Sequence, residues 1–374
     1  MAHVLPPYRA DHVGSFLRSP QIVNARRFFN EGKITKDELT KIEDEEIAIL
    51  VQNELKNGIK AVTDGEYRRS FWHLDFLAAL KGIAHIKAKA WSVAFASHQP
   101  KAETVKIVDK ISFGKDHPFL EAFSKLKAIA GDNEVKYTIP SPSMLHLICC
   151  VREENYEPIP LYKDNEELLY SDIANAWIDA VNELYARGCR YLQLDDTSWG
   201  EFCSLKKRAA YKDRGIDVDK VAKHYVEVIN KIMAAKPHDM VICMHICRGN
   251  FRSTWFSSGG YEPVAPILFA NCNIDGFFLE YESERAGDFT PLRYIKDQTV
   301  VLGLVSSKLG QLEDKEMIKA RIKEATQYVP LERLCLSTQC GFSSTEEGNI
   351  LTYEEQWAKI RFVCEVAKEV WADA

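Results

Sequence analysis

The sequence predicts a (β/α)8 barrel, the α/β fold also called a TIM barrel, organised as one domain over residues 1–374. Two observations predict this fold. Short apolar, β-branched segments recur eight times along the chain, and amphipathic helical patterns lie between them. Such alternation is typical of a parallel sheet joined by crossover helices, and eight parallel strands close into a barrel. A barrel needs about 250 residues, so we expect an insertion as well.

The predicted strands end, with one exception, in polar or metal-binding residues. In chain order they are Asp11–Phe16, Ala61–Glu66, Val135–Pro142, Arg190–Asp196, Met240–Arg248, Ile274–Glu282, Thr299–Lys308 and Leu334–Phe342. Active sites of this fold lie at the carboxyl ends of the strands. The sequence therefore predicts one convergent site at that end of the barrel.

Two helical patterns are the clearest between these strands. Leu168–Arg187 and Val218–Ala235 carry apolar residues at three- and four-residue spacing, and Gly188 follows the first as a stop signal. The surplus length fits an insertion near residues 68–134, which we expect to cover the barrel mouth as a lid. Within it we predict hairpin strands rather than helices, at 72–76 (WHLDF), 85–96 (HIKAKAWSVAFA) and 103–113 (ETVKIVDKISF).

Composition narrows the class of protein. Charged residues make up 27% of the chain and the formal net charge is −6, so nothing favours binding to nucleic acid or to an anionic membrane. We see no secretory signal and no apolar run near the ~18 residues of a transmembrane helix. The 10 cysteines are spread irregularly, unlike a disulfide framework. We expect a cytoplasmic protein with free thiols, and no feature predicts its oligomeric state.

A metal site is the strongest chemical prediction. His245 and Cys247 stand two apart on a predicted strand, so both side chains face the same way. This pair alone is more typical of a buried histidine beside a packed cysteine. Cys340 makes a metal site the favoured explanation, because it ends the last predicted strand and Gly341 allows the backbone to turn there. Strand ends of a closed barrel converge on one mouth, where the three side chains can meet.

A carboxylate on the sixth strand is the expected fourth ligand. Glu280 is the first choice, Glu282 has the same strand parity, and Glu284 is expected to be solvated. Imidazole, thiolate and carboxylate together suit Zn²⁺ better than Mg²⁺ or Ca²⁺. Zinc deprotonates a coordinating thiol, and the thiolate is the nucleophile. The other cysteines are expected to be packed: Cys149, Cys150, Cys189, Cys203, Cys243, Cys272, Cys335 and Cys364.

Five short motifs mark the predicted strand ends. They are HVGSF at 12–16, DGE at 64–66, LQLDD at 192–196, HIC at 245–247 and QCG at 339–341. In the same order and spacing they resemble the IGSF, HGE, IQIDE, HMC and DCG segments of the cobalamin-independent methionine synthase family, in its catalytic C-terminal barrel.

The resemblance implies a fold, a reaction and a set of roles. The family has a zinc-containing (β/α)8 barrel that moves a methyl group from a folate to the sulfur of homocysteine, giving methionine. Two carboxylates can pair with the amino group of homocysteine, and a serine with its backbone N–H can take the carboxylate. Helix-cap or turn roles are the alternative for these three residues. Carried over, the substrate residues are Ser15, Glu66 and Asp195, and the zinc ligands are His245, Cys247, Glu280 and Cys340.

Three departures from the family leave the methyl donor and the acid open. The full-length enzymes carry an additional N-terminal barrel. The family's histidine after strand seven, which protonates the leaving folate, is absent from Gly303–Lys308. His12 is a candidate replacement, but packing or capping of the first strand is the favoured explanation for this residue. The family's folate-stacking tryptophan after strand three is not matched in Ser141–His146.

Three other functions compete with this prediction. A related zinc enzyme acting on another thiol, such as a coenzyme M transferase, would not need Ser15, Glu66 and Asp195 for an α-amino acid. A metal-free lyase on the related uroporphyrinogen decarboxylase scaffold would leave His245 and two strand-end cysteines unexplained. A zinc-storing or regulatory protein would need a closed site of four protein ligands.

Overall fold

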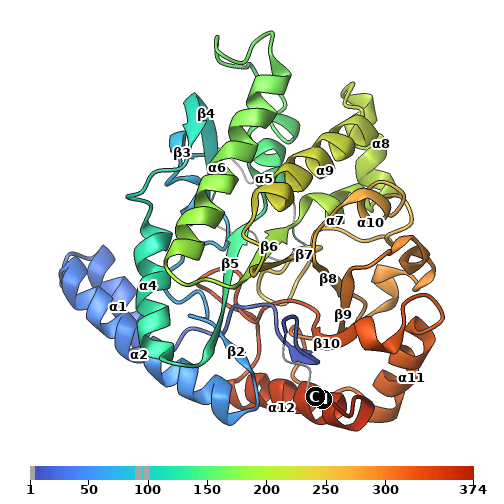
Figure 1. Ribbon diagram of the computed structural model, residues 1–374. Coiled ribbons are helices and arrows are strands. Elements are labelled where there is room, and N and C mark those ends of the chain that lie inside the picture. The colour runs from blue at the N-terminus through green and yellow to red at the C-terminus, as the bar shows by residue number, and fades with distance from the viewer. Residues whose placement is uncertain (1–4, 89–94, 96–101) are drawn as a thin grey trace.

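Eight parallel strands form the centre of the computed structural model, which describes residues 5–88, 95 and 102–374. Figure 1 shows them surrounded by helices, so the predicted (β/α)8 barrel is confirmed. Each strand overlaps its predicted segment. In sheet order they are β1 (Ala10–Asp11), β10 (Leu334–Thr338), β9 (Thr299–Val305), β8 (Gly276–Glu280), β7 (Val241–Ile246), β6 (Tyr191–Asp196), β5 (Glu134–Pro140) and β2 (Ala61–Val62).

The two end strands of this sheet, β1 and β2, are not paired with each other. Side-chain contacts and a single backbone bond join the seam between them instead. The ring Nε2 of His12 lies 3.2 Å from the carbonyl oxygen of Ala61, Thr63 Oγ1 donates to the Gly14 carbonyl at 2.8 Å, and the Phe16 N–H donates to the Gly65 carbonyl at 3.1 Å. The predicted strand Asp11–Phe16 is therefore too long, because after Asp11 this segment forms isolated bonds rather than a strand ladder.

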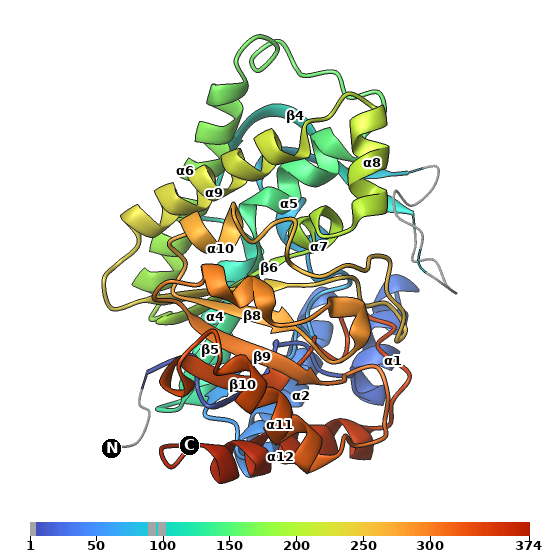
Figure 2. The same ribbon diagram turned by 90° about the vertical axis from the view of Figure 1, so that its right-hand side faces the viewer.

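Helices cover the outside of the barrel (Figure 2). The predicted helix Leu168–Arg187 is α6 (Glu166–Ala186), and Gly188 has a positive φ of 97° just after its end. The predicted helix Val218–Ala235 is α9, with the same bounds. No helix of the described residues has both the length and the apolar character needed to cross a membrane. The others are α1 (Pro20–Asn30), α2 (Lys36–Lys56), α5 (Pro142–His146), the π-helix Leu147–Val151, α7 (Ser198–Phe202), α8 (Leu205–Asp213), α10 (Leu268–Asn271), α11 (Lys315–Ala325) and α12 (Tyr353–Val370), with 3-10 turns at Glu284–Ala286, Thr290–Tyr294 and Leu331–Arg333.

The inserted region contains the predicted hairpin and two helices that were not predicted. Strands β3 (Lys81–Lys87) and β4 (Glu103–Ser112) pair antiparallel, while most of the predicted strand 85–96 lies outside the described residues. The strand predicted at 72–76 is wrong. Asp75 accepts hydrogen bonds from the two preceding backbone N–H groups of Ser70 and Phe71, and α3 (Leu74–Leu77) forms there.

The second helix in this region is α4 (Pro118–Ala130), so the predicted insertion extends too far along the chain. Phe119, Phe123 and Leu126 recur at helical spacing and are buried. This helix packs against α2 and β5, as a barrel helix does. The inserted part therefore ends before α4.

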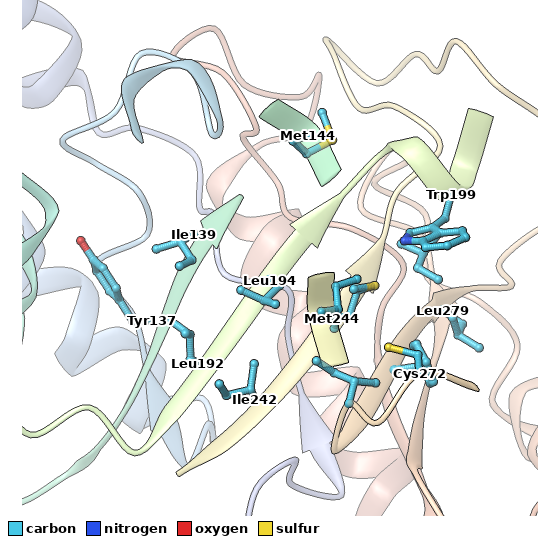
Figure 3. Close-up of a cluster of buried hydrophobic side chains, with 14 of the residues drawn as sticks. Tyr137, Ile139, Met144, Leu192, Leu194, Trp199, Ile242, Met244, Cys272 and Leu279 are labelled. Carbon is cyan, nitrogen blue, oxygen red and sulfur yellow. The ribbon is translucent and has the colours of Figure 1, made fainter. Parts of the chain in front are cut away.

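Alternate residues of the strands face two different apolar layers. Leu192, Leu194, Ile242 and Met244 pack in the layer between the strands and the helices (Figure 3). The residues between them point the other way, into the barrel. A second cluster that includes Tyr191, Cys243, Phe278, Val301 and Cys335 fills this interior. It forms a floor, and the inward residues that follow along the same strands stand above it.

Candidate metal centre

Four buried side chains from the ends of three strands meet above this floor. His245 lies in β7 and Cys247 just after it, Glu280 ends β8, and Cys340 follows β10. Their ligand atoms all lie within 4.8 Å of one another. The sulfur atoms of Cys247 and Cys340 are 3.6 Å apart. The structure thus brings together the four residues that the sequence predicts as ligands.

Strand parity explains why these residues converge. On β7, Cys243 belongs to the interior cluster, so His245 and Cys247, at steps of two, face the same way. On β8 the same relation links Phe278 to Glu280. The alternative carboxylates lie elsewhere: Glu282 is paired with Arg285, and Glu284 is exposed.

The unsatisfied polar atoms of the cluster fit a bound cation. Among the residues that the structure describes, no hydrogen-bond partner satisfies either ring nitrogen of His245 or the Oε1 atom of Glu280. Burying such groups without a partner costs free energy. A metal ion would satisfy these lone pairs and those of the two sulfur atoms together. Imidazole and thiolate donors select borderline-soft ions.

The cluster also favours ionised sulfur. The hydrogen bond from Cys247 and the nearby His245 hold the pKa of the Cys340 thiol well below its usual range. The same bond, together with burial, raises the pKa of Cys247 far above its usual range. Burial raises the pKa of Glu280. A bound metal ion would displace the remaining thiol proton.

A pocket with a cavity volume of about 60 Å³ opens over the cluster. It contains the three residues that the sequence predicts as substrate ligands, namely Ser15, Glu66 and Asp195. Aromatic rings form much of the remaining wall. The other lining residues include Phe71, Trp72, His73, Phe95, Phe251 and Phe256, together with Arg152, Thr197 and Asn250.

Glu66 is held in an unusual backbone conformation in this pocket. Its φ is 61°, in the left-handed region that costs a non-glycine residue free energy. One carboxylate oxygen accepts a hydrogen bond from Thr138 at 2.9 Å and lies 3.5 Å from Arg69. The other, Oε2, is buried and has no hydrogen-bond partner in the described part of the chain. This free oxygen can accept a hydrogen bond from a ligand.

Asp195 supplies a second carboxylate to the same pocket. Its Oδ1 accepts a hydrogen bond from Gln193 at 2.6 Å, and burial, aided by the nearby Glu66, raises its pKa to about 7. The helix-cap role, which was the alternative for Asp195, is performed by its neighbour Asp196. Asp196 accepts from the backbone N–H groups of Ser198 and Trp199, at 2.6 and 3.3 Å, at the start of α7.

Ser15 lies against the segment that carries Cys340. Its hydroxyl accepts a hydrogen bond from the Ser343 backbone N–H at 3.2 Å. A Cβ atom on Gly341 would come within 2.0 Å of the Ser15 oxygen, so only glycine allows this approach. The two strand-end segments are therefore closely packed at the base of the pocket.

His12 is not brought to this site. It is buried at the β1–β2 seam, beside Ala61, and its Nε2 lies 3.5 Å from Glu54. It is not among the residues that line the pocket. Burial and the charge of Lys136 lower its pKa to about 4. Its position suits packing and closure of the barrel better than proton donation to a ligand.

Sequence reasoning missed the aromatic wall and Arg152. Arg152 follows the π-helix, bonds Glu201 at 2.6 Å and lies 5.8 Å from the ring centre of Phe256. These residues stand in loops, where no periodic pattern marks the side that faces the barrel mouth. In the sequence, the adjacent aromatic residues Trp72 and His73 were the one signal of this wall. In the structure their rings stack with centroids 4.4 Å apart.

Comparison with known proteins assigns the family. Residues 9–369 match the family model described as the catalytic domain of the cobalamin-independent synthase. The chain belongs to the cobalamin-independent methionine synthase family. The resemblance predicted from the motifs is therefore confirmed, and the protein is a methyltransferase of the cobalamin-independent methionine synthase type.

Several relatives share this barrel. The uncharacterized protein YxjG of Bacillus subtilis is 45% identical over 98% of this chain and 95% of its own length. A solved structure from Listeria monocytogenes, named as a candidate vitamin-B12 independent methionine synthase, is 44% identical, covers 99% of both chains and has a TM-score of 0.78. The 5-methyltetrahydropteroyltriglutamate–homocysteine methyltransferase of Acidithiobacillus ferrooxidans is 23% identical over 92% of this chain, which spans only 40% of that longer protein.

Proposed function

We propose that this protein transfers a methyl group to the sulfur of homocysteine and forms methionine, with a zinc ion held by His245, Cys247, Glu280 and Cys340. One observation carries the proposal. Buried imidazole, thiol and carboxylate groups, several without partners, have their ligand atoms within 4.8 Å of one another. When bound, zinc supplies the Lewis acidity that keeps a substrate thiol deprotonated at neutral pH.

The carboxylates of the pocket support an amino-acid thiol as the substrate. Glu66 and Asp195 both line the pocket that contains the cysteines, and the free Oε2 of Glu66 can accept a hydrogen bond from an ammonium group. Ser15 would bind the substrate carboxylate through its hydroxyl and backbone N–H. A sulfonate thiol such as coenzyme M has no ammonium group and would be repelled by two carboxylates, so this alternative is disfavoured.

The reaction exchanges one bond for another. The sulfur lone pair forms a bond to the methyl carbon, while the bond from that carbon to the donor breaks and its electron pair leaves with the donor atom. If that atom is the nitrogen of a 5-methyltetrahydrofolate, it then takes up a proton. The aromatic wall around Trp72, Phe251 and Phe256 supports a donor with a flat ring system, which stacks on such side chains.

Two measurements test the metal and the substrate. Elemental analysis should find about one zinc per chain, and Cys340→Ala should lose the metal while Cys335→Ala, which alters a cysteine of the interior floor, should keep it. Zinc retained in Cys340→Ala would overturn the proposed site.

A donor screen in the presence of L-homocysteine tests the other half of the reaction. Methyl-folates of different glutamate length are compared with other methyl compounds, and methionine is measured by mass spectrometry. Methionine formed from a methyl-folate supports the proposal. Methionine formed only from another class of donor would support homocysteine as the methyl acceptor and would contradict a folate as the methyl donor.

A further inference from the structure

Lys308 is a buried cation beside the metal ligands. It follows β9, the strand that pairs with β8 on one side and β10 on the other. These neighbours carry Glu280 and Cys340, so Lys308 stands between two ligand-bearing strand ends. Its side chain is 5% exposed, and its Nζ atom has no hydrogen-bond partner among the described residues. An ammonium group buried without an acceptor costs free energy unless an anion lies nearby.

The backbone around Lys308 is fixed to the Cys340 segment. Ser307 donates from its backbone N–H and its hydroxyl to the Gln339 side chain, at 2.7 and 3.1 Å. The same hydroxyl contacts the Gly341 carbonyl oxygen at 2.9 Å. These bonds are made to the residues on either side of Cys340. Lys308 is therefore held in place relative to that ligand.

The other cations beside the cluster are each paired with a carboxylate, whereas Lys308 has no such pair in the described part of the chain. Arg285 pairs with Glu282 and lies 3.4 Å from Glu280, and Arg248 lies 3.9 Å from Glu280 and bonds the Gly259 carbonyl oxygen at 2.8 Å. In its own loop, Glu313 is paired with Lys359 at 2.9 Å, so that carboxylate is already neutralised. The ionisable groups that lie close enough to interact with the charge of Lys308 include Glu280, Cys247 and Cys340, and His245 and Asp195 are further ionisable groups beside them.

The charges of the ligands explain why such a cation is useful. Two thiolates and one carboxylate bring one more negative charge than a divalent cation neutralises. A substrate thiolate adds another, and in a buried site that repulsion is weakly screened. A fixed positive charge buried beside these ligands offsets this repulsion.

We propose that Lys308 is the counter-charge for the substrate thiolate, a positioning residue that lets an anionic sulfur enter an already anionic cluster. This inference rests on the proposed function, because it requires a thiol substrate at the zinc site. Lys308 forms no bond to the substrate carbon and contributes no proton. Its effect falls on the binding of the deprotonated thiol and on the pH at which that binding occurs.

The test compares three variants of the full-length, zinc-loaded protein. Lys308→Met removes the charge and keeps an apolar stem of similar length, and Lys308→Arg keeps the charge. Lys315→Met removes a lysine that pairs with Glu369 on α12, outside the cluster. Zinc affinity is measured by competition with a chelator, and L-homocysteine binding by calorimetry across a range of pH.

Lys308→Met should keep its zinc, or bind it more tightly, because the substitution removes a positive charge that repels Zn²⁺. Its dissociation constant for L-homocysteine should rise on the order of tenfold at neutral pH, and the midpoint pH of binding should move up by about one unit. Lys308→Arg and Lys315→Met should match the wild type. An unchanged pH profile in Lys308→Met, or loss of zinc from it, overturns the inference. Failure of the wild type itself to bind L-homocysteine would instead contradict the proposed function.

Discussion

Glu66 shows how much depends on single side chains in this pocket. Its backbone is strained and one carboxylate oxygen is buried without a partner, two features that cost folding free energy. Costs of this kind concentrate at functional sites, where a ligand repays them. The backbone turn is held locally, because the Glu66 N–H donates to Asp64 Oδ1 at 2.9 Å, whereas the side-chain contacts with Thr138 and Arg69 depend on the folded barrel and could not be predicted from the sequence.

Glu66→Gln should weaken binding of L-homocysteine while zinc is retained. The amide removes the charge that would face the ammonium group, and a charged hydrogen bond contributes about 1.5–3 kcal/mol, so the dissociation constant should rise roughly 10- to 150-fold. Calorimetry measures this change. As a control, a thiol acid without the amino group should bind wild type and variant alike. Equal loss for both ligands would argue against an ammonium contact.

At the scale of elements, the seam between β1 and β2 is the place where the barrel lacks a strand ladder. Both strands have 2 residues, and side-chain contacts with a single backbone bond replace their missing ladder. The pattern DHVGSF predicted a strand there because apolar spacing does not reveal whether a partner strand is within reach. The error at 72–76 has a local cause, because Asp75 lies in α3 and its carboxylate accepts from the backbone N–H groups of Ser70 and Phe71 before the helix.

His12→Ala should destabilise the protein and leave the chemistry of the site intact. The variant loses a buried contact with Ala61 and creates a cavity, so we expect the free energy of unfolding to fall by about 2–4 kcal/mol. Urea denaturation measures this change, with zinc content and L-homocysteine affinity as controls. A large fall in turnover at unchanged stability would instead favour the acid role predicted from the sequence.

The contribution of His12 to stability should depend on pH. Its pKa falls from 6.5 to about 4 in the folded state because of burial and the charge of Lys136, so below pH 6.5 the unfolded chain binds the proton more readily. Stability therefore declines as pH falls through this window, by about 1.4 kcal/mol per unit for one histidine. The difference in stability between wild type and His12→Ala should shrink from pH 7 to pH 5. A difference in unfolding free energy that stays constant between pH 7 and pH 5 would contradict the lowered pKa of His12.

At the scale of the whole molecule, the metal centre joins strand ends that are far apart in the sequence. Cys247 and Cys340 are separated by 93 positions, and the closed barrel brings their sulfur atoms to 3.6 Å. The sequence predicted this convergence because strand order and parity follow from the barrel fold alone. The aromatic wall and Lys308 were missed, since loops that vary in length carry the wall and a lysine at a strand end is usually solvated.

Removal of zinc should lower thermal stability. Metal binding to the folded state alone stabilises it, and the ligands here connect β7, β8 and β10. Treatment with a chelator should lower the melting temperature by several degrees, since each kcal/mol lost corresponds to roughly 1–2 °C in a chain of this size. Added Zn²⁺ should restore it and added Mg²⁺ should not. Recovery with Mg²⁺ would contradict a site built from thiolates.

The central claim is that a zinc ion in this cluster binds the sulfur of homocysteine. Zinc X-ray absorption of the purified protein, with and without L-homocysteine, measures the ligands of the metal directly. The account predicts one nitrogen, one oxygen and two sulfur ligands before addition, and an additional sulfur after it, with no such gain from L-methionine. A zinc spectrum that does not change with L-homocysteine but changes with another thiol, or a protein without zinc, would contradict the account.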